Sequence, residues 1–387
     1  MKIAIVGAGL LGRLIAWRLL SLQENKLVDQ SLNISLFDSD FSGANSAAKV
    51  AAAMLAPLSE LVSSEACVAE KGLASIELWR QWDVELKAKD IDMAFQQTGS
   101  LVVTHGNDEG DFQLFLNSLY NDIQTTSISE HDIEQLNRRS LDDLEPSLAK
   151  VFQKALFLKP EGSVDNVALL NGLMTLLESS AIHLNEEQLP ETLTKSFLAA
   201  YDQVVDCRGF SAKQQWLDAK AQGVSDKVLR GVRGEVIRVR ADDVSLSRPV
   251  RLMHPRYQLY VAPKPHNEFV IGATQIESES EHTITARSSL ELLSALYSID
   301  TGFAESQVLN SHAKCRPAFM DNLPSINLNN NLLCVNGLYR HGYLLSPVVV
   351  EEVLHCLGFH AISHWPEIVE GTLNKHNAHV LNAGVAC

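Results

Sequence analysis

The feature that most constrains this chain is a short apolar strand that runs directly into a glycine-rich turn. Residues 2–6 read KIAIV and residues 7–12 read GAGLLG. Apolar residues follow at helical spacing over 14–20, as expected for a helix that opens at the turn. A second strand is predicted at 34–37 and ends in Asp38. This order of strand, turn, helix and strand predicts a βαβ unit in a parallel sheet.

The spacing of the three glycines is typical of a dinucleotide-binding site. Gly7 permits the tight turn, Gly9 lets the backbone approach a pyrophosphate, and Gly12 allows helix and strand to pack closely. The start of the helix offers unpaired N–H groups to phosphates, and Asp38 would accept hydrogen bonds from a ribose diol. Asp38 comes 26 positions after Gly12, more than the roughly 20 that is usual, and a polar insertion explains the difference. The candidate cofactor-binding residues of this motif are Gly7, Gly9, Leu10, Leu11, Gly12 and Asp38.

The rest of the chain alternates between two kinds of sequence. Period-two alternation over 230–275 predicts antiparallel strands with one solvated face, and the arginines and lysine of 227–240 are expected on that face. Residues 156–158 and 204–206 are interpreted as returns to the first domain, and a terminal helix is expected from about Pro347. The predicted division is a nucleotide-binding domain in segments 1–90, 151–215 and 311–387, interleaved with a substrate domain in segments 91–150 and 216–310.

Composition and charge narrow the class of partner. The formal net charge of -15 argues against nucleic acid or an anionic membrane, because both attract positively charged surfaces. No run of residues approaches the roughly 18 apolar positions of a membrane span. The six cysteines are scattered, without zinc-ligand spacing. We therefore expect a cytoplasmic protein with reduced cysteines and no bound metal. The sequence leaves open whether the chain forms a homo-oligomer.

Longer segments carry a more specific signal than the glycine turn. They extend over nearly the whole chain and read VAAAMLAP (50–57), QTGSLVV (97–103), EGSVDNVALL (161–170), VVDCRG (204–209), RGVRGEVIRVR (230–240), HPRYQLYVAP (254–263), VIGAT (270–274), CRPAFMDNLPSI (315–326) and GLYRHGYLLSP (337–347). In these segments the sequence resembles the FAD-dependent D-amino-acid oxidase superfamily, and within it the glycine oxidase (ThiO-like) branch associated with thiamine biosynthesis. The resemblance implies a Rossmann-like FAD-binding α/β domain with an interleaved α+β substrate domain built on an antiparallel sheet.

The resemblance also implies roles for individual residues. Arg316 would hold the carboxylate of the substrate, and Tyr260 would reach the same carboxylate from the sheet. Arg340 would lie beside flavin and substrate, and Met54 would line the flavin pocket. The implied catalytic residues are Arg316, Tyr260, Arg340 and Met54. The further implied FAD contacts are Lys49, Ala51, Ala52, Met54, Gly209, Arg340, His341, Gly342, Tyr343 and Leu344.

Each implied catalytic residue also has an ordinary structural explanation. Arg316 could form an inter-domain salt bridge, Arg340 could be a solvated arginine in a turn, and Tyr260 and Met54 could belong to the core. The sequence departs from the family pattern at Gln275, a position that can be apolar in the family, and at Leu338, where histidine is common in the family. These two positions put the choice of substrate in doubt more than the binding of flavin.

The chemistry expected from these residues is the oxidation of glycine or a small amine such as sarcosine. A planar guanidinium binds a carboxylate in bidentate fashion and fixes its orientation, while the flavin accepts hydride from the α carbon. O2 is the expected electron acceptor, with hydrogen peroxide as product. The alternatives are a dehydrogenase that avoids O2, a flavoprotein that oxidises an amine on a macromolecule, a non-enzymatic dinucleotide-binding protein and a methyltransferase.

Overall fold

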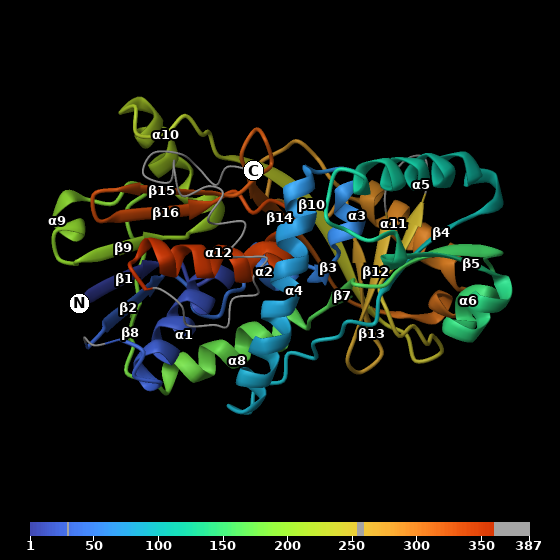
Figure 1. Cartoon of the computed structure of the whole chain (residues 1–387), viewed down its shortest axis with the longest axis horizontal. Coiled ribbons are helices and arrows are strands. Elements are labelled where there is room, and N and C mark those ends of the chain that lie inside the picture. The colour runs from blue at the N-terminus through green and yellow to red at the C-terminus, as the bar shows by residue number, and fades with distance from the viewer. Residues whose placement is uncertain (29–30, 254–258, 360–387) are drawn as a thin grey trace.

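Two sheets organise the protein, which is represented here by a computed structural model describing residues 1–28, 31–253 and 259–359 (Figure 1). In the described residues, the first sheet has the strand order β15 (Ser325–Asn329), β16 (Leu332–Asn336), β9 (Gln203–Asp206), β1 (Lys2–Val6), β2 (Asn33–Asp38) and β8 (His183–Glu186). All neighbours are parallel except β15 and β16. The predicted βαβ unit is confirmed, because β1 and β2 pair in parallel across helix α1 (Leu10–Glu24).

The second sheet lies beside the first and is mostly antiparallel (Figure 1). Its order is β14 (Gln307–Ala318), β10 (Arg230–Arg240), β13 (Glu268–Gly272), β12 (Leu259–Lys264), β11 (Val250–Met253), β4 (Ser100–Thr104), β6 (Lys154–Leu158) and β5 (Ile133–Asn137). The exception is the parallel pair β11 and β4. A short ladder joins β3 (Met54–Leu55) to β7 (Gly162–Ser163). These strands confirm a mixed α/β fold with an antiparallel sheet.

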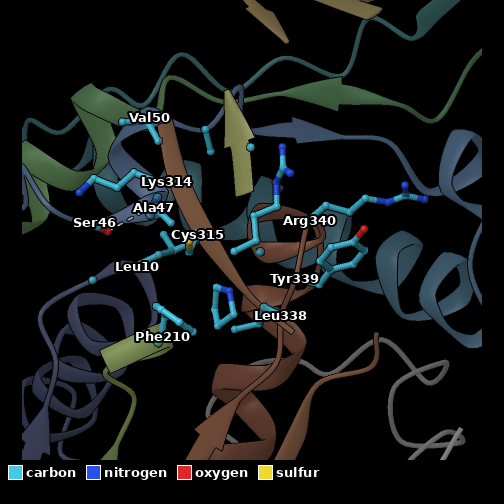
Figure 2. Close-up of a pocket in the computed structure, with 18 of the residues that line it drawn as sticks. Leu10, Ser46, Ala47, Val50, Phe210, Lys314, Cys315, Leu338, Tyr339 and Arg340 are labelled. Carbon is cyan, nitrogen blue, oxygen red and sulfur yellow. Dashed lines mark hydrogen bonds between the residues drawn. The ribbon is translucent and has the colours of Figure 1, made fainter. Parts of the chain in front are cut away.

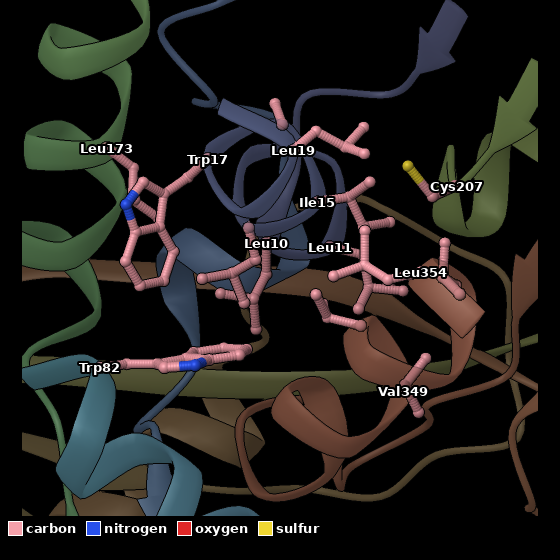
Figure 3. Close-up of a cluster of buried hydrophobic side chains, with 14 of the residues drawn as sticks. Leu10, Leu11, Ile15, Trp17, Leu19, Trp82, Leu173, Cys207, Val349 and Leu354 are labelled. Atoms are coloured by element: carbon pink, nitrogen blue, oxygen red, sulfur yellow. The ribbon is translucent and has the colours of Figure 1, made fainter. Parts of the chain in front are cut away.

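Helices cover both sheets and supply a large share of the core. They are α2 (Ala47–Val50), α3 (Pro57–Leu61), α4 (Ala66–Lys87), α5 (Glu109–Ile123), α6 (Arg138–Leu144), α7 (Pro146–Ala149), α8 (Asn166–Glu178), α9 (Lys195–Leu198), α10 (Lys213–Ala221), α11 (Ala286–Ile299) and α12 (Gly342–Cys356). The largest core cluster packs α1 against α4, α8 and α12 (Figure 3). Within it, the rings of Trp17 and Trp82 meet edge to face with centroids 5.4 Å apart, a favourable aromatic geometry. This packing holds the glycine turn on a rigid base.

Helix α12 begins earlier than the sequence analysis predicts. It starts at Gly342, and Pro347 lies inside it. Proline has no N–H and leaves the carbonyl four residues earlier without its helical partner. That carbonyl belongs to Tyr343, and it accepts a hydrogen bond of 2.8 Å from the indole Nε1 of Trp79 on α4. The helix therefore continues through the proline because the neighbouring helix satisfies the freed carbonyl.

The segments of the two sheets interleave along the chain, and two runs lie where the sequence analysis does not place them. Residues 311–318 are predicted to belong to the nucleotide-binding domain, but they end strand β14, which pairs with β10 in the second sheet. Residues 156–158 belong to β6, which pairs with β4 and β5 in the second sheet. The interpretation of residues 156–158 as a return to the first domain is wrong, because a short continuous apolar run predicts a buried strand without indicating which sheet it joins. The five-segment domain division stays a prediction. Two parts of the predicted segments lie outside the described residues. They are 360–387, at the end of the last nucleotide-binding segment, and 254–258, at the start of the HPRYQLYVAP segment.

One further expectation is corrected. The arginines of β10 do not share a solvated face, because Arg233 is buried and donates to the buried carboxylate of Glu235 at 2.7 Å. Cys207, Cys315, Cys334 and Cys356 are free thiols as expected. Across the described part of the chain, no helix is both long enough and apolar enough to span a membrane. The cytoplasmic location stays a prediction.

Candidate active site

A cavity of about 1190 Å³ lies between the two sheets. One end is formed by the carboxyl ends of β1, β2 and β9, where ligands of open α/β sheets bind. The other end is formed by one face of the second sheet and by the turn that precedes α12. Figure 2 shows side chains from these separate elements converging, with Leu10 from α1, Lys314 and Cys315 from β14, and Tyr339 and Arg340 from the turn.

The glycine turn has the geometry that its sequence predicts. Gly7 has a φ of 104°, which side chains disfavour, and a Cβ there would lie 2.9 Å from the backbone of Arg208. A Cβ on Gly12 would lie 1.8 Å from the carbonyl oxygen of Gly7. A Cβ on Gly9 would meet only the Oγ of Ser46, at 3.6 Å. Gly7 and Gly12 are therefore required by the fold, whereas Gly9 keeps the cavity side of the turn free for a ligand.

Polar contacts fix the turn at the start of α1. Asp38 accepts hydrogen bonds from the N–H groups of Ala8, at 2.6 Å, and of Asp40, at 3.0 Å. The buried guanidinium of Arg13 donates to the carbonyls of Ala8, Phe41 and Leu170 at 2.6–2.7 Å. Among the described residues, no side chain caps the start of α1. The first N–H groups of this helix are therefore available to an anion such as a pyrophosphate.

The turn over residues 51–54 forms a wall of the cavity and has its carbonyl groups tied to the protein. Ala53 has a left-handed φ of 52°, and its carbonyl accepts from the N–H of Val164 at 3.1 Å. The carbonyl of Ala52 accepts from the ammonium of Lys264 at 2.7 Å. In the described part of the chain, the N–H groups of Ala52 and Ala53 have no hydrogen-bond acceptor. This wall therefore offers backbone donors to a ligand.

The second sheet brings the side chains of Arg251, Tyr260 and Arg316 into the cavity. Arg251 on β11 pairs with Tyr260 on β12, and Tyr260 pairs with Gly272 on β13. Residues directly opposite each other in a sheet share a face, so Arg251 and Tyr260 are neighbours. Burial raises the pKa of the Tyr260 phenol, against the opposing charge of Arg316. Tyr260 is therefore a neutral hydrogen-bonding group at ordinary pH.

Two glycines make room for these side chains. A Cβ on Gly234 would lie 2.3 Å from the guanidinium carbon of Arg316, and a Cβ on Gly272 would lie 2.7 Å from the phenol oxygen of Tyr260. The Nη1 of Arg316 donates to the carbonyl of Thr274 at 3.2 Å. In the described residues, no carboxylate lies within ion-pair distance of Arg316. Its guanidinium is therefore free to bind an anionic ligand.

A buried carboxylate organises the remaining charges at this end of the cavity. Glu60 on α3 accepts from Arg251 at 3.0 Å and forms an ion pair of 2.7 Å with the Nε of Arg340. Burial alone would raise the pKa of Glu60, but the charges of Arg340 and Arg251 outweigh it and lower the pKa to about 2. Arg340 also donates to the hydroxyl of Ser63. Glu60 is therefore ionised, and Arg340, although partly exposed, is held by the ion pair with Glu60.

His341 lies behind this ion-pair cluster. Its Nδ1 is 3.4 Å from a carboxylate oxygen of Glu60, and its Nε2 is 3.3 Å from the Oγ of Ser64. Burial lowers the pKa of His341 to about 4, and the nearby arginines act in the same direction. The imidazole is therefore neutral at pH 7.

Most of the residues singled out in the sequence line this one cavity. They are Gly7, Gly9, Leu10, Leu11, Asp38, Ala51, Ala52, Met54, Gly209, Tyr260, Arg316, Arg340, His341, Gly342, Tyr343 and Leu344. Two others do not line it. Gly12 lies beneath the turn, and the ammonium of Lys49 donates to the carbonyl of Ser42 at 2.6 Å. The assigned roles of these residues remain predictions.

The sequence analysis missed two residues of the sheet end, Glu60 and Arg251. Arg251 lies between Val250 and Leu252, which face the core behind the sheet. The alternation of a strand could therefore have placed Arg251 on the opposite face with Tyr260. The sequence around Glu60 does not indicate a role for it, because its partners Arg251, Arg340 and His341 come from other segments of the chain.

The amino-acid sequence is similar to a known protein family and to individual proteins. The DAO family model, described as FAD dependent oxidoreductase, matches residues 2–354. A putative thiamine biosynthesis oxidoreductase, ThiO, from Rhizobium etli is 35% identical over 353 residues, which cover 91% of this chain and 95% of that protein. Glycine oxidase from Geobacillus kaustophilus is 24% identical over 360 residues, covering 89% of this chain and 90% of that protein.

Solved structures share the fold. The crystal structure of glycine oxidase from Geobacillus kaustophilus superposes with a TM-score of 0.75 at 22% identity, covering 94% of this chain and 96% of that chain. Iminodiacetate oxidase from Chelativorans sp. BNC1 superposes with a TM-score of 0.73 at 18% identity, covering 95% of this chain and 98% of that chain.

Proposed function

Because this chain belongs to the DAO family of FAD-dependent oxidoreductases, we propose that it deaminates glycine or another small amine oxidatively. The chain is an oxidoreductase of the glycine oxidase/ThiO type. The observation that carries the proposal is Arg316, a cavity-facing guanidinium with no carboxylate partner in the described residues, beside the phenol of Tyr260.

The cofactor is FAD, and the residues at the first end of the cavity fit it. The glycine turn and the uncapped start of α1 suit a pyrophosphate. The carboxylate of Asp38 retains acceptor capacity for a ribose, since a carboxylate has about four lone-pair sites and two N–H groups contact it. The free N–H groups of Ala52 and Ala53 suit the polar edge of a ring system. When bound, FAD would supply the acceptor for a hydride from the α carbon of the substrate.

The protein contributes binding and orientation at the sheet end. Arg316 would bind the substrate carboxylate in bidentate fashion, and the phenol O–H of Tyr260 would donate a hydrogen bond to the same group. Fixing the carboxylate holds the α C–H bond in one direction, which lowers the barrier by restricting the reactants. Glu60 is a poor base, because its pKa is held at about 2. We therefore propose that the substrate binds with a neutral amine and that no side chain removes its proton.

The proposal also covers the electron acceptor of the reaction and the pathway to which it belongs. We propose O2 as the acceptor, with hydrogen peroxide as product, and a place in thiamine biosynthesis. The name of the Rhizobium etli relative, a putative thiamine biosynthesis oxidoreductase, supports the pathway, and the name glycine oxidase of a second relative supports the reaction.

Anaerobic mixing with a panel of amines tests the proposal. The purified protein is mixed with glycine, sarcosine and D-alanine without oxygen, and flavin absorbance is followed in a stopped-flow instrument. We expect glycine or sarcosine to bleach the flavin, and readmitted oxygen to restore absorbance with one peroxide per turnover. Bleaching without peroxide would indicate a dehydrogenase. If every free amine leaves the flavin oxidised, the proposal is wrong and a macromolecular amine becomes the leading substrate.

A further inference from the structure

Lys264 is a buried lysine whose ammonium joins two segments of backbone at the cavity wall. It lies at the end of β12, on the same face as Tyr260 and Ala262, and is 8% exposed. Its Nζ donates to the carbonyls of Ala52 at 2.7 Å and Val164 at 2.6 Å. Within the described residues, no carboxylate lies close enough to form an ion pair with it. Lys264 itself does not line the cavity.

The contact with Ala52 fixes the direction of the next N–H group. In a trans peptide, the carbonyl of one residue and the N–H of the next point in opposite directions. Because the carbonyl of Ala52 points to Lys264, the N–H of Ala53 points away from it. Ala53 lines the cavity, and its N–H has no acceptor in the described part of the protein.

The turn needs this support because its conformation is strained. Ala53 adopts a left-handed φ of 52°, a conformation that a residue with a Cβ disfavours. The N–H of Val164 holds the carbonyl of Ala53 on one side of the turn, and Lys264 bridges Ala52 and Val164 on the other.

The groups around Lys264 determine how easily its ammonium loses a proton. Burial lowers the pKa of Lys264 to about 7, with Arg238 on β10 acting in the same direction and Asp165 at the start of α8 opposing both. A buried ammonium is costly unless it makes strong hydrogen bonds. Here it makes two, both to carbonyls of the cavity wall.

We propose that Lys264 is a positioning residue for the cofactor, holding the Ala52–Ala53 peptide so that the Ala53 N–H is presented to FAD. The inference rests on the FAD cavity and is independent of which amine is oxidised. It assigns the lysine no contact with substrate and no role in proton transfer.

The test measures FAD affinity and the flavin spectrum in Lys264→Met and Lys264→Arg. Apoprotein is titrated with FAD, and the dissociation constant and the visible absorption bands are recorded. Losing one oriented hydrogen bond to the cofactor corresponds to a rise of about tenfold in Kd, and we expect that rise in Lys264→Met together with a shift of the flavin bands. Lys264→Arg retains a charged donor and should bind FAD within about threefold of the wild type.

Lys71 supplies a matched control, because it is also 8% exposed but contacts Glu352 at 3.2 Å, away from the turn. Lys71→Met should lose stability and keep the wild-type FAD spectrum. A purely structural role of Lys264 would lower the stability of apoprotein and holoenzyme equally, and an unchanged Kd and spectrum in Lys264→Met would overturn the proposal. If Lys264→Met does not fold, Lys264→Gln keeps one donor and should give an intermediate Kd; a wild-type Kd and spectrum there would equally overturn it.

Discussion

The two ends of the cavity are built in different ways. At the nucleotide end, the candidate ligand-binding groups are mainly backbone N–H groups, from the stretch between β1 and α1 and from the 51–54 turn, with the carboxylate of Asp38 beside them. At the sheet end, the polar groups are side chains from strands β11, β12 and β14, helix α3 and the turn before α12. Backbone donors need a precise local conformation, whereas converging side chains need the whole tertiary fold.

This difference has a consequence for mutations. A change at Gly7 or Gly12 should damage the fold and the cofactor site together, because both glycines lie against the backbone of the turn or the residues that follow β9. A change at the sheet end should leave FAD bound and alter substrate binding. The following predictions test this separation, beginning with the largest effect.

Gly12→Ala should have the largest effect. The new Cβ would lie 1.8 Å from the carbonyl oxygen of Gly7, so backbone must move, and we expect the free energy of unfolding to fall by more than about 3 kcal/mol. The protein should purify without FAD or not fold. Gly9→Ala is the control, because its Cβ meets only Ser46 Oγ at 3.6 Å; it should fold normally and bind FAD more weakly. A yellow Gly12→Ala protein of wild-type stability would contradict the prediction.

Arg316→Ala should have the next largest effect, on substrate rather than cofactor. Removing a charge-assisted contact of about 2–3 kcal/mol should raise KM for the best amine by about 30- to 150-fold, while FAD stays bound. Steady-state kinetics with a flavin spectrum checks both parts, and a KM within about twofold of the wild type would show that Arg316 does not hold the carboxylate.

Gly234→Ala tests the same contact between Arg316 and the substrate carboxylate in a different way. Its Cβ would lie 2.3 Å from the guanidinium carbon of Arg316, so it should displace the guanidinium while keeping its charge. We expect a smaller rise in KM than in Arg316→Ala. An equal or larger rise would indicate that the position of the guanidinium, rather than its charge, carries the binding.

The smallest effect concerns pH and His341. Its folded pKa of about 4 lies below the unfolded value of 6.5, so the unfolded chain binds more protons between these values. Stability is therefore complete above about pH 6.5 and is lost as the pH falls toward 4. Urea unfolding of the holoenzyme over this range should show the loss, and His341→Asn should reduce its slope. The same slope in both proteins would remove His341 as the cause.

Much of the nucleotide end could be predicted from sequence, because its rules are local. A strand, three spaced glycines and a terminal acid determine the turn without reference to distant residues. Pro347 shows the opposite case. A helix normally ends before a proline, and only the indole of Trp79, on another helix, shows why α12 continues through it. Segment 156–158 is a related case. Its apolar pattern predicts a strand, but the pairing with β4 and β5 depends on residues elsewhere in the chain.

The sequence by itself determined the βαβ unit, the dinucleotide site and the family resemblance, because these depend on residue order and spacing. Only the tertiary structure decided that Glu60 holds Arg251 and Arg340, that Gly234 and Gly272 make room for Arg316 and Tyr260, and that Lys264 supports the 51–54 turn. The physical reason is that charge pairing, burial and close approach depend on distances between atoms. Residues far apart in the chain acquire those distances only when the two sheets pack around the cavity.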